Sequence, residues 1–276
     1  MPNYTGKFNV KGKLLINSNS IFNVMTSNST YLYFGGGIEN AGLFIAGGAT
    51  FTNDQTLLGN GVLEFNAKVL IDTATIIRNK ARVYINSGTL NGSNSESTWI
   101  NDQDSELKYS TTQEPMLTGD LVADATNNTV EYNCSDSMYI AHAGSNGIYY
   151  NLKVSGLGKK KIKYNIIATR LFLEGGNIVV DDNKTLSIDD YNVNAVAYSS
   201  GSILGKFVRK ISPGNWYHFP VGDQSHTHSF HIQPTDYDTL TVEFKNGSSG
   251  PNGLPLLENL RRIPANGYTM KDTGMS

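Results

Sequence analysis

The sequence repeats a short apolar triplet at intervals of 20 residues. The matched triplets are Leu43-Phe44-Ile45, Leu63-Glu64-Phe65 and Val83-Tyr84-Ile85. Further matches at about the same interval are the positions Phe51, Leu70 and Leu90, and the pairs Leu57-Leu58 and Ile76-Ile77. A period near 20 with two or three short strands per repeat is typical of one coil of a β-solenoid, in which each coil contacts only its neighbours.

Composition agrees with this interpretation. The chain of 276 residues contains 30 Asn, 28 Gly, 24 Ser and 23 Thr, and only 17% of its residues are charged. These four residue types are unfavourable inside helices and frequent in turns. Asn also tolerates the left-handed backbone region and can form amide ladders between stacked copies. We therefore predict that Asn40, Asn60, Asn66 and Asn86 lie at the corners of successive coils.

The predicted fold is all-β, a right-handed parallel β-helix-like solenoid followed by an antiparallel, sandwich-like cap. Residues 1–133 carry the repeats, and residues 134–200 continue them after a loop at 134–147. Residues 201–247 contain longer strands, predicted to be antiparallel, that would cover the open end of the solenoid. Residues 248–276 have the composition of a linker and the start of a following module. The alternative is a β-sandwich of hairpins, but a sandwich gives no reason for register to repeat at 20.

Several classes of function are excluded by simple counts. The net charge of −2 disfavours a general nucleic-acid binder, which must neutralise phosphates. No apolar run reaches the roughly 18 to 20 residues of a membrane-spanning helix. The single cysteine, Cys134, excludes an internal disulfide. Because residues 1–7 do not resemble a signal peptide, an exported protein would have to be represented here as a mature chain or a fragment.

Two stretches carry recognisable motifs. The first comprises Asn128-Thr129-Val130-Glu131-Tyr132-Asn133 and, further on, Tyr149-Tyr150-Asn151-Leu152-Lys153-Val154-Ser155-Gly156. The second comprises Gly201-Ser202-Ile203-Leu204-Gly205-Lys206-Phe207-Val208-Arg209 and Tyr217-His218-Phe219-Pro220-Val221-Gly222-Asp223. Together they resemble modules of Bacteroidetes cell-surface, adhesin-like proteins that are exported by the type IX secretion system. The resemblance covers roughly residues 128–245.

This resemblance implies a secreted or surface-anchored stalk or adhesin segment of a longer polypeptide, with the type IX translocon as its partner during export and an unidentified glycan or surface ligand. It departs from the family after Asp223, where histidines replace the usual aromatic and Arg/Asn-Pro sequence, and no C-terminal sorting domain is visible. Triplets similar to the O-glycosylation sequon of these bacteria begin one residue before Thr73, Ser137 and Thr239.

Histidines form one candidate metal site. His226 and His228 would project from the same face of a strand, and Asp223 could add an oxygen ligand, which suits zinc or nickel. His231 lies an odd number of residues from both and is expected on the other face. A solvated polar loop is the alternative interpretation.

Acidic residues form a second candidate site. Asp102, Asp104 and Glu106 alternate, so on a strand their carboxylates would share one face, where calcium could bridge them. The alternatives are a solvent-facing acidic turn or the catalytic acids of a polysaccharide lyase or glycoside hydrolase, since β-helix folds host such enzymes. Apart from these candidate ions we expect no cofactor.

Exposed aromatic residues could stack on sugar rings, although half of the aromatics on alternating strands normally face a core. The candidates are Trp99, Tyr149, Tyr150, Trp216 and Tyr217. The lysines at 159–161 are interpreted as a solvated turn. We therefore expect a non-enzymatic secreted or cell-surface stalk, with a β-helix polysaccharide-cleaving enzyme and a trimeric phage tail-fibre segment as the alternatives.

Overall fold

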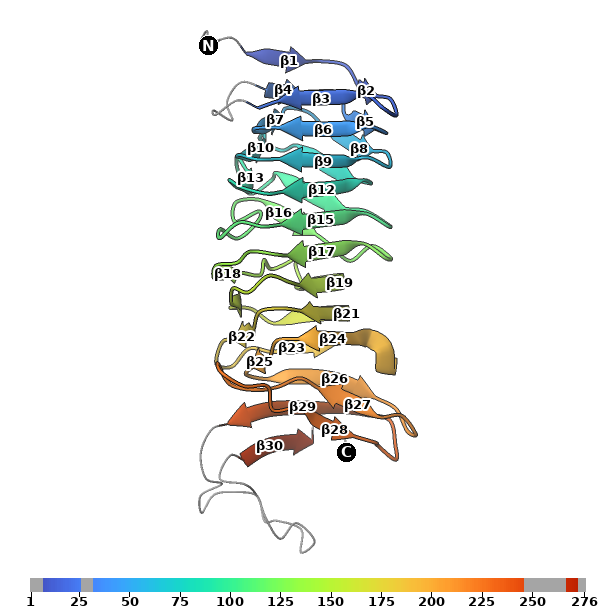
Figure 1. The fold of residues 1–276 in the computed structure, drawn as a ribbon, viewed down its shortest axis with the longest axis vertical. Helices are drawn as coiled ribbons and strands as arrows, with labels where there is room; N and C mark the ends of the chain where they lie inside the picture. The colour runs from blue at the N-terminus through green and yellow to red at the C-terminus, as the bar shows by residue number, and fades with distance from the viewer. Residues whose placement is uncertain (1–6, 26–31, 246–266, 273–276) are drawn as a thin grey trace, which may run out of the picture.

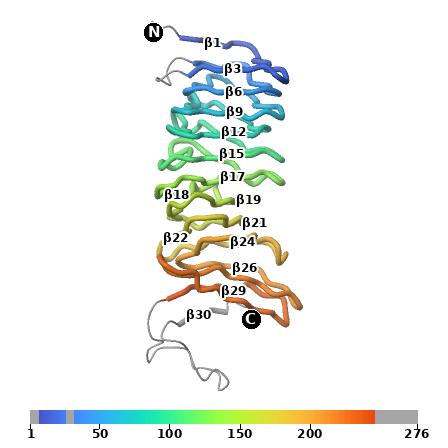
Figure 2. The backbone as a smooth tube through the Cα atoms, viewed as in Figure 1, coloured from blue at the N-terminus to red at the C-terminus, as the bar shows by residue number. Residues whose placement is uncertain are grey.

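The protein is a rod of stacked β-coils, as the computed structural model shows for residues 7–25, 32–245 and 267–272 (Figure 1). The chain winds from one end of the rod to the other, so that neighbours in space are successive coils (Figure 2). The one helical element in the described residues is a single 3-10 turn, η1 (Val193–Ala195). Within the same residues, no helix is long and apolar enough to cross a membrane.

Two short sheets form two faces of the N-terminal half, and all of their strand pairs are parallel. Sheet A consists of β1 (Phe8–Val10), β4 (Leu32–Phe34), β7 (Ala49–Phe51), β10 (Val69–Ile71) and β13 (Leu90–Gly92). Sheet B consists of β2 (Leu14–Ile16), β5 (Ile38–Asn40), β8 (Gln55–Leu58), β11 (Ile76–Asn79), β14 (Thr98–Asn101) and β16 (Asp120–Val122).

One long sheet runs the length of the rod, while a smaller sheet replaces A and B in the C-terminal half. Sheet C contains β3 (Ile21–Val24), β6 (Leu43–Ala46), β9 (Val62–Phe65), β12 (Arg82–Ile85), β15 (Glu106–Tyr109), β17 (Thr129–Tyr132), β19 (Ile148–Val154), β21 (Ile166–Glu174), β23 (Leu186–Ile188), β24 (Val196–Ser200), β26 (Phe207–Ile211), β29 (Asp238–Lys245) and β30 (Gly267–Asp272). Sheet D contains β18 (Met138–Tyr139), β20 (Lys160–Ile162), β22 (Ile178–Val180) and β25 (Ile203–Leu204).

The predicted β-solenoid is confirmed, but the coils are not of constant length. In sheet C the paired residues Leu63 and Val83 are 20 residues apart, whereas the next partner of Val83 is Leu107, 24 residues on. The first matched triplet was out of phase, because Leu63 pairs with Phe44 and leaves Leu43 37% exposed. A one-residue slip exchanges the two faces of a strand, so burial decides the register.

The other two predicted alignments were also shifted. Leu70 pairs with Thr50 and Asn91 instead of Phe51 and Leu90. Leu57 pairs with Ile38 and Asn79, while Ile77 pairs with Gln55. Extra residues in the turns between strands absorb these differences, because only the strands have to stack.

Side chains that alternate along each strand fill a single continuous core. Its N-terminal part is aromatic, since Phe44 lies 5.1 Å from Phe22 and 5.2 Å from Phe65 between ring centroids, and Phe34 lies 5.8 Å from Phe51. Such tilted and offset ring pairs contribute about 0.5–1.5 kcal/mol each beyond their buried area. Apolar stacking therefore holds adjacent coils together from inside the rod.

Buried asparagines line one corner between sheets B and C. Asn79 donates its amide to Oδ1 of Asn101 at 2.7 Å, and Asn101 donates to Oδ1 of Asn128 at 3.3 Å. Each amide also reaches a backbone carbonyl of the following strand of sheet C, that of Glu106 for Asn79 and that of Thr129 for Asn101. These amides satisfy backbone groups at a bend where the ladder is interrupted.

The predicted corner asparagines are therefore only partly correct. Asn40 is buried and belongs to this corner, and Asn86 donates to Asn66 at 3.2 Å on another turn. Asn60 is exposed and contributes no ladder, because the buried position on the next coil is Asn79. None of the four has a left-handed backbone; that conformation occurs at Asn19, Asn127 and Asn183.

A small antiparallel segment ends the rod. Antiparallel pairing links β26 to β29 and β29 to β30, and the hairpin of β27 (Tyr217–Phe219) and β28 (Phe230–Ile232) lies beside them. The prediction that residues 203–208 belong to the antiparallel part was wrong, since β25 and β26 stack in parallel on β22 and β23. The predicted loop at 134–147 also contains a strand, β18. The predicted linker lies largely outside the described residues.

Replacing Asn101 by alanine tests the asparagine ladder. We expect the free energy of unfolding to fall by about 2–4 kcal/mol, because the variant leaves the buried Oδ1 of Asn128 and the carbonyl of Thr129 without their donor. Chemical denaturation followed by circular dichroism measures the change. Asn60→Ala is the matched control and should change stability by no more than about 0.5 kcal/mol; equal losses in both variants would refute the ladder.

Candidate functional site

The motif residues that resemble surface-protein modules are mostly buried. Tyr132 and Tyr149 are both 0% exposed, and their hydroxyl oxygens lie 2.7 Å apart. The backbone N–H of Ala141 donates to Tyr132, and the hydroxyl of Tyr149 donates to the carbonyl of Ala141. The two tyrosines thus fix the segment between β17 and β19 to the core, which gives this motif a structural role.

Arg209 is the buried cation of the second motif. Its guanidinium is 0% exposed and donates to the carbonyl groups of His218 at 2.8 Å and Val193 at 3.2 Å. The rings of Tyr217 and Phe219 lie 5.0 and 5.7 Å away, within cation–π distance. Burial lowers the pKa of Arg209 to about 10, which leaves it charged at neutral pH. Arg209 therefore attaches the hairpin to the last coils.

The end of that motif forms a tight turn. The backbone groups of Gly222 and Thr227 form an antiparallel bridge, and Oδ1 of Asp223 accepts the N–H groups of Ser225 and His226 at 2.7 and 2.8 Å. A Cβ atom at Gly222 would lie 2.3 Å from the carbonyl oxygen of His226, so no larger residue fits. Hydrogen bonds from these backbone groups lower the pKa of Asp223, because they stabilise its charged form.

Lys160 contradicts the prediction of a solvated turn at 159–161. It lies on β20 and is 0% exposed, and its Nζ donates to the carbonyl oxygens of Cys134 at 2.7 Å and Gly158 at 2.9 Å. Gly156 accepts a longer bond of 3.5 Å. Burial lowers the pKa of Lys160 to about 8. Its amine satisfies turn carbonyls of adjacent coils, while Lys159 and Lys161 remain partly exposed.

The pH dependence of stability tests this role. Because the folded-state pKa of Lys160 lies below its ordinary value, the folded state disfavours the charged form; the cost applies fully below pH 8 and disappears as pH rises towards about 10.5. Relative to Lys160→Met, the wild type should gain up to about 3 kcal/mol of unfolding free energy over that range.

Urea denaturation at pH 7.5 and pH 10 measures this difference. Lys161→Met is the control on the same strand and should track the wild type at both values. If the wild type and Lys160→Met show the same pH dependence, Lys160 is not buried as a charged group at neutral pH.

The three predicted calcium ligands are not brought together. Residues 102–105 form a turn between β14 and β15 in which Asp104 has a left-handed backbone, with φ of 58°. Asp102 lies 3.7 Å from Arg78 and 3.6 Å from Lys80, whereas Glu106 begins the next strand and faces outward from sheet C. The prediction that these carboxylates share one strand face was therefore wrong, because the turn separates them.

A shallow polar groove does form around Glu106. Its volume is about 370 Å³, and it is lined by residues from several coils, namely Arg82, Asp104, Ser105, Glu106, Asn127, Thr129, Lys153, Phe172 and Glu174. Burial and the neighbouring Glu131 raise the pKa of Glu106. The groove thus combines a carboxyl group that holds its proton to higher pH with two cations that the sequence places far apart.

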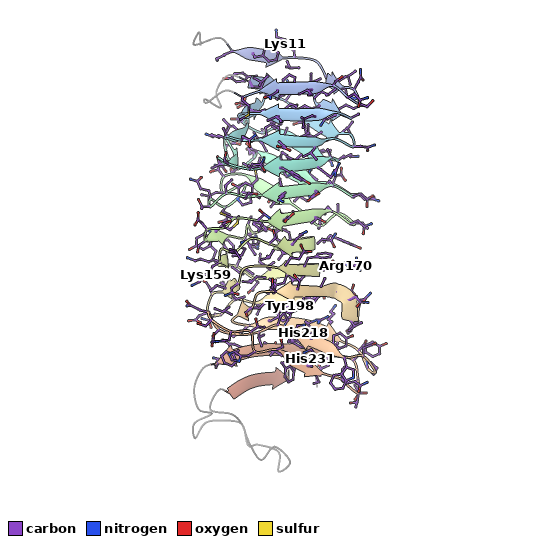
Figure 3. All side chains as sticks on the ribbon, in the orientation of Figure 1. Lys11, Lys159, Arg170, Tyr198, His218 and His231 are labelled. Atoms are coloured by element: carbon purple, nitrogen blue, oxygen red, sulfur yellow. The ribbon has the colours of Figure 1, made fainter. Side chains whose placement is uncertain are left out.

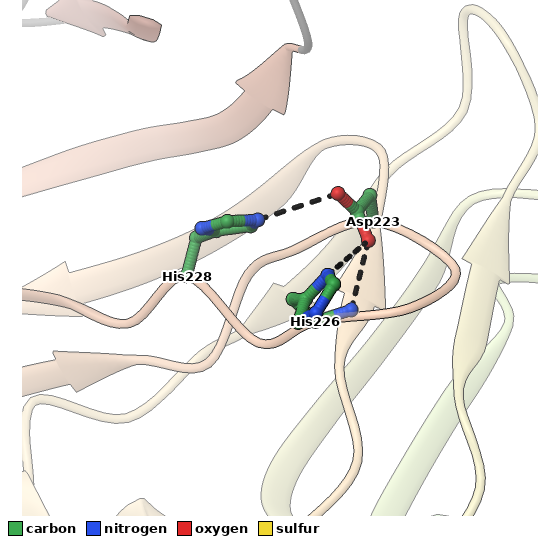
Figure 4. Close-up of side chains that lie close together, drawn as sticks. All are labelled: Asp223, His226 and His228. Carbon is green, nitrogen blue, oxygen red and sulfur yellow. Dashed lines mark hydrogen bonds and ion pairs between the residues drawn. The ribbon is translucent and has the colours of Figure 1, made fainter. Parts of the chain in front are cut away.

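Asp223, His226 and His228 are brought together as the sequence predicts, and their ligand atoms lie within 4.8 Å of one another (Figure 4). No other group of three potential ligands this close occurs among residues 7–25, 32–245 and 267–272. His231 lies apart from them on β28, stacked on His218 with ring centroids 4.5 Å apart. Burial, with His231 and Arg209 nearby, lowers the pKa of His218 to about 4.

Most of the predicted sugar-stacking aromatics face the core. Trp99, Tyr149 and Tyr217 are 0% exposed, Tyr150 is half-buried, and Trp216 is 62% exposed. The sequence did not single out Tyr198, which packs against His218 with 4.8 Å between ring centroids on the surface near the cap (Figure 3). Of the three glycosylation candidates, Thr73 and Ser137 are exposed and Thr239 is partly buried on β29.

Comparisons with protein-family models, curated protein sequences and solved structures gave no match to this chain. Function must therefore be argued from the geometry. The sequence analysis missed Lys160 because a lysine run is normally solvated, and it missed the Arg82–Glu106 neighbours because their proximity depends on coil length.

Proposed function

We propose that this chain is a stalk segment of a secreted or cell-surface adhesin that is exported by a type IX secretion system. The observation that carries the proposal is sheet C, whose 13 strands extend through the whole described rod. Because successive strands are joined by backbone hydrogen bonds and by apolar stacking, the segment resists bending and can hold a binding module at a distance from the cell. The motif resemblance supports the export route.

The structure also provides a reason why the resembling motifs recur in such chains. Tyr132, Tyr149 and Arg209 are each buried and hydrogen-bonded to the backbone of a neighbouring coil. These residues attach non-repetitive segments to a repetitive core. Their role is the assembly of a rod, which agrees with a mechanical function.

Surface labelling tests the location. In the source bacterium, antibodies against this segment should label intact cells, and external protease should remove the label. Disruption of the type IX translocon should retain the protein inside the cell. Labelling that requires permeabilised cells and is unaffected by the translocon would contradict the proposal, and a stable trimer in sedimentation would favour the tail-fibre alternative.

The groove around Glu106 favours a second candidate, a polysaccharide-cleaving enzyme. A carboxyl group with a raised pKa can act as a general acid, and Arg82 and Lys153 could bind an acidic sugar. The groove lies on the outer face of sheet C, where a long polymer can lie across several coils.

Release of reducing ends from a panel of acidic polysaccharides tests this activity. If the groove is catalytic, Glu106→Gln should lower the rate by about 10²–10⁴-fold, the usual contribution of a positioned acid. Glu39→Gln, on sheet B beside Lys13, is the control and should leave the rate unchanged. Absence of release from every polymer, or equal rates in both variants, would exclude catalysis in this groove.

A further inference from the structure

The turn between β27 and β28 holds the Asp223, His226 and His228 side chains on a rigid support. The N–H of Asp223 donates to the carbonyl of His226 at 3.0 Å, and the N–H of His228 donates to the carbonyl of Val221 at 2.8 Å. Thr227 attaches the turn to the preceding coil through its hydroxyl, which lies 2.6 Å from that of Ser202. The three side chains are therefore presented by a backbone that is fixed on both sides.

The carboxylate of Asp223 is oriented by the turn. Its Oδ1 accepts the N–H groups of Ser225 and His226, so the plane of the carboxylate is fixed and Oδ2 points towards His228 (Figure 4). The ring of His228 lies flat on Phe244 of β29, with 3.9 Å between centroids and 10° between planes. Both groups are therefore positioned before any ligand arrives, as metal ligands usually are.

The distances suit a metal ion better than a simple hydrogen bond. Nε2 of His228 lies 3.3 Å from Oδ2 of Asp223, longer than the usual 2.9–3.0 Å of an N–H···O bond. Two ligands on one tetrahedral zinc, each bonded at about 2.0–2.1 Å, are about 3.3–3.4 Å apart. Nδ1 of His226 lies 3.9 Å from Oδ1, and the side chain is 74% exposed, so a rotation can bring a ring nitrogen to the same point.

We propose that Asp223, His226 and His228 bind one divalent transition-metal ion of the zinc class, with water in the remaining coordination position. Two imidazoles and one carboxylate are a donor set that zinc accepts, whereas calcium prefers six to eight oxygen ligands. The ion would join the turn to β29 through His228. This inference goes beyond the proposed stalk function, because it concerns the cap and does not depend on export or adhesion.

Titration with zinc sulfate tests the site in the full chain after treatment with a chelator. Calorimetry and elemental analysis should find one zinc per chain, and cobalt substituted for zinc should give the visible absorption of a tetrahedral ion. Zinc should also raise the melting temperature, since a ligand that binds only the folded state stabilises it. Calcium should produce neither effect.

Variants separate this site from the other histidines. His228→Gln and Asp223→Asn should each weaken zinc binding by at least about tenfold and remove the thermal shift. His226→Gln provides the test if those variants fail to fold, because the side chain of His226 is largely exposed and packs little. His231→Gln is the matched control and should bind as the wild type does. Failure of the wild type to bind zinc, or an equal loss in His231→Gln, would overturn the proposal.

Discussion

Parallel pairing between successive coils is the interaction on which the rest of this structure depends. Each strand of sheet C takes its partners from the coil before and the coil after, so its position is set by residues about 20 positions away on either side. Once that pairing exists, like side chains lie above one another, and the phenylalanine stack and the asparagine ladder follow from it. The rod has no separate core to be built first.

The cost of this arrangement is paid at the turns, where backbone groups leave the ladder. Different polar side chains satisfy them in different parts of the rod. Buried amides such as that of Asn101 do so between sheets B and C, and the amine of Lys160 does so where sheet D begins. At the cap, Arg209 performs the same task for the carbonyls of His218 and Val193. An unpaired buried carbonyl is expensive, which explains why charged groups are tolerated inside the rod.

The same economy shapes the candidate sites. Surfaces on a solenoid are built from positions that are distant in sequence and adjacent in space, as Arg82 and Glu106 are in the groove on sheet C. The cluster of Asp223, His226 and His228 differs, because a single tight turn brings its members together. Local geometry therefore made that cluster visible in the sequence, whereas the groove depends on the register of several coils.

The sequence by itself determined the fold class, because a 20-residue recurrence of short apolar strands is compatible with few other architectures, and it determined the histidine–aspartate cluster through short spacing. It also gave strand positions such as Val62–Phe65 and Val69–Ile71 correctly. Only the tertiary structure decided the register of each coil, since residues inserted in turns change the period without changing the strands. It alone showed that Lys160 is buried, that Asn79 and not Asn60 occupies the corner, and that Asp102 and Glu106 lie on different faces, because burial at these positions depends on what the neighbouring coil places beside them.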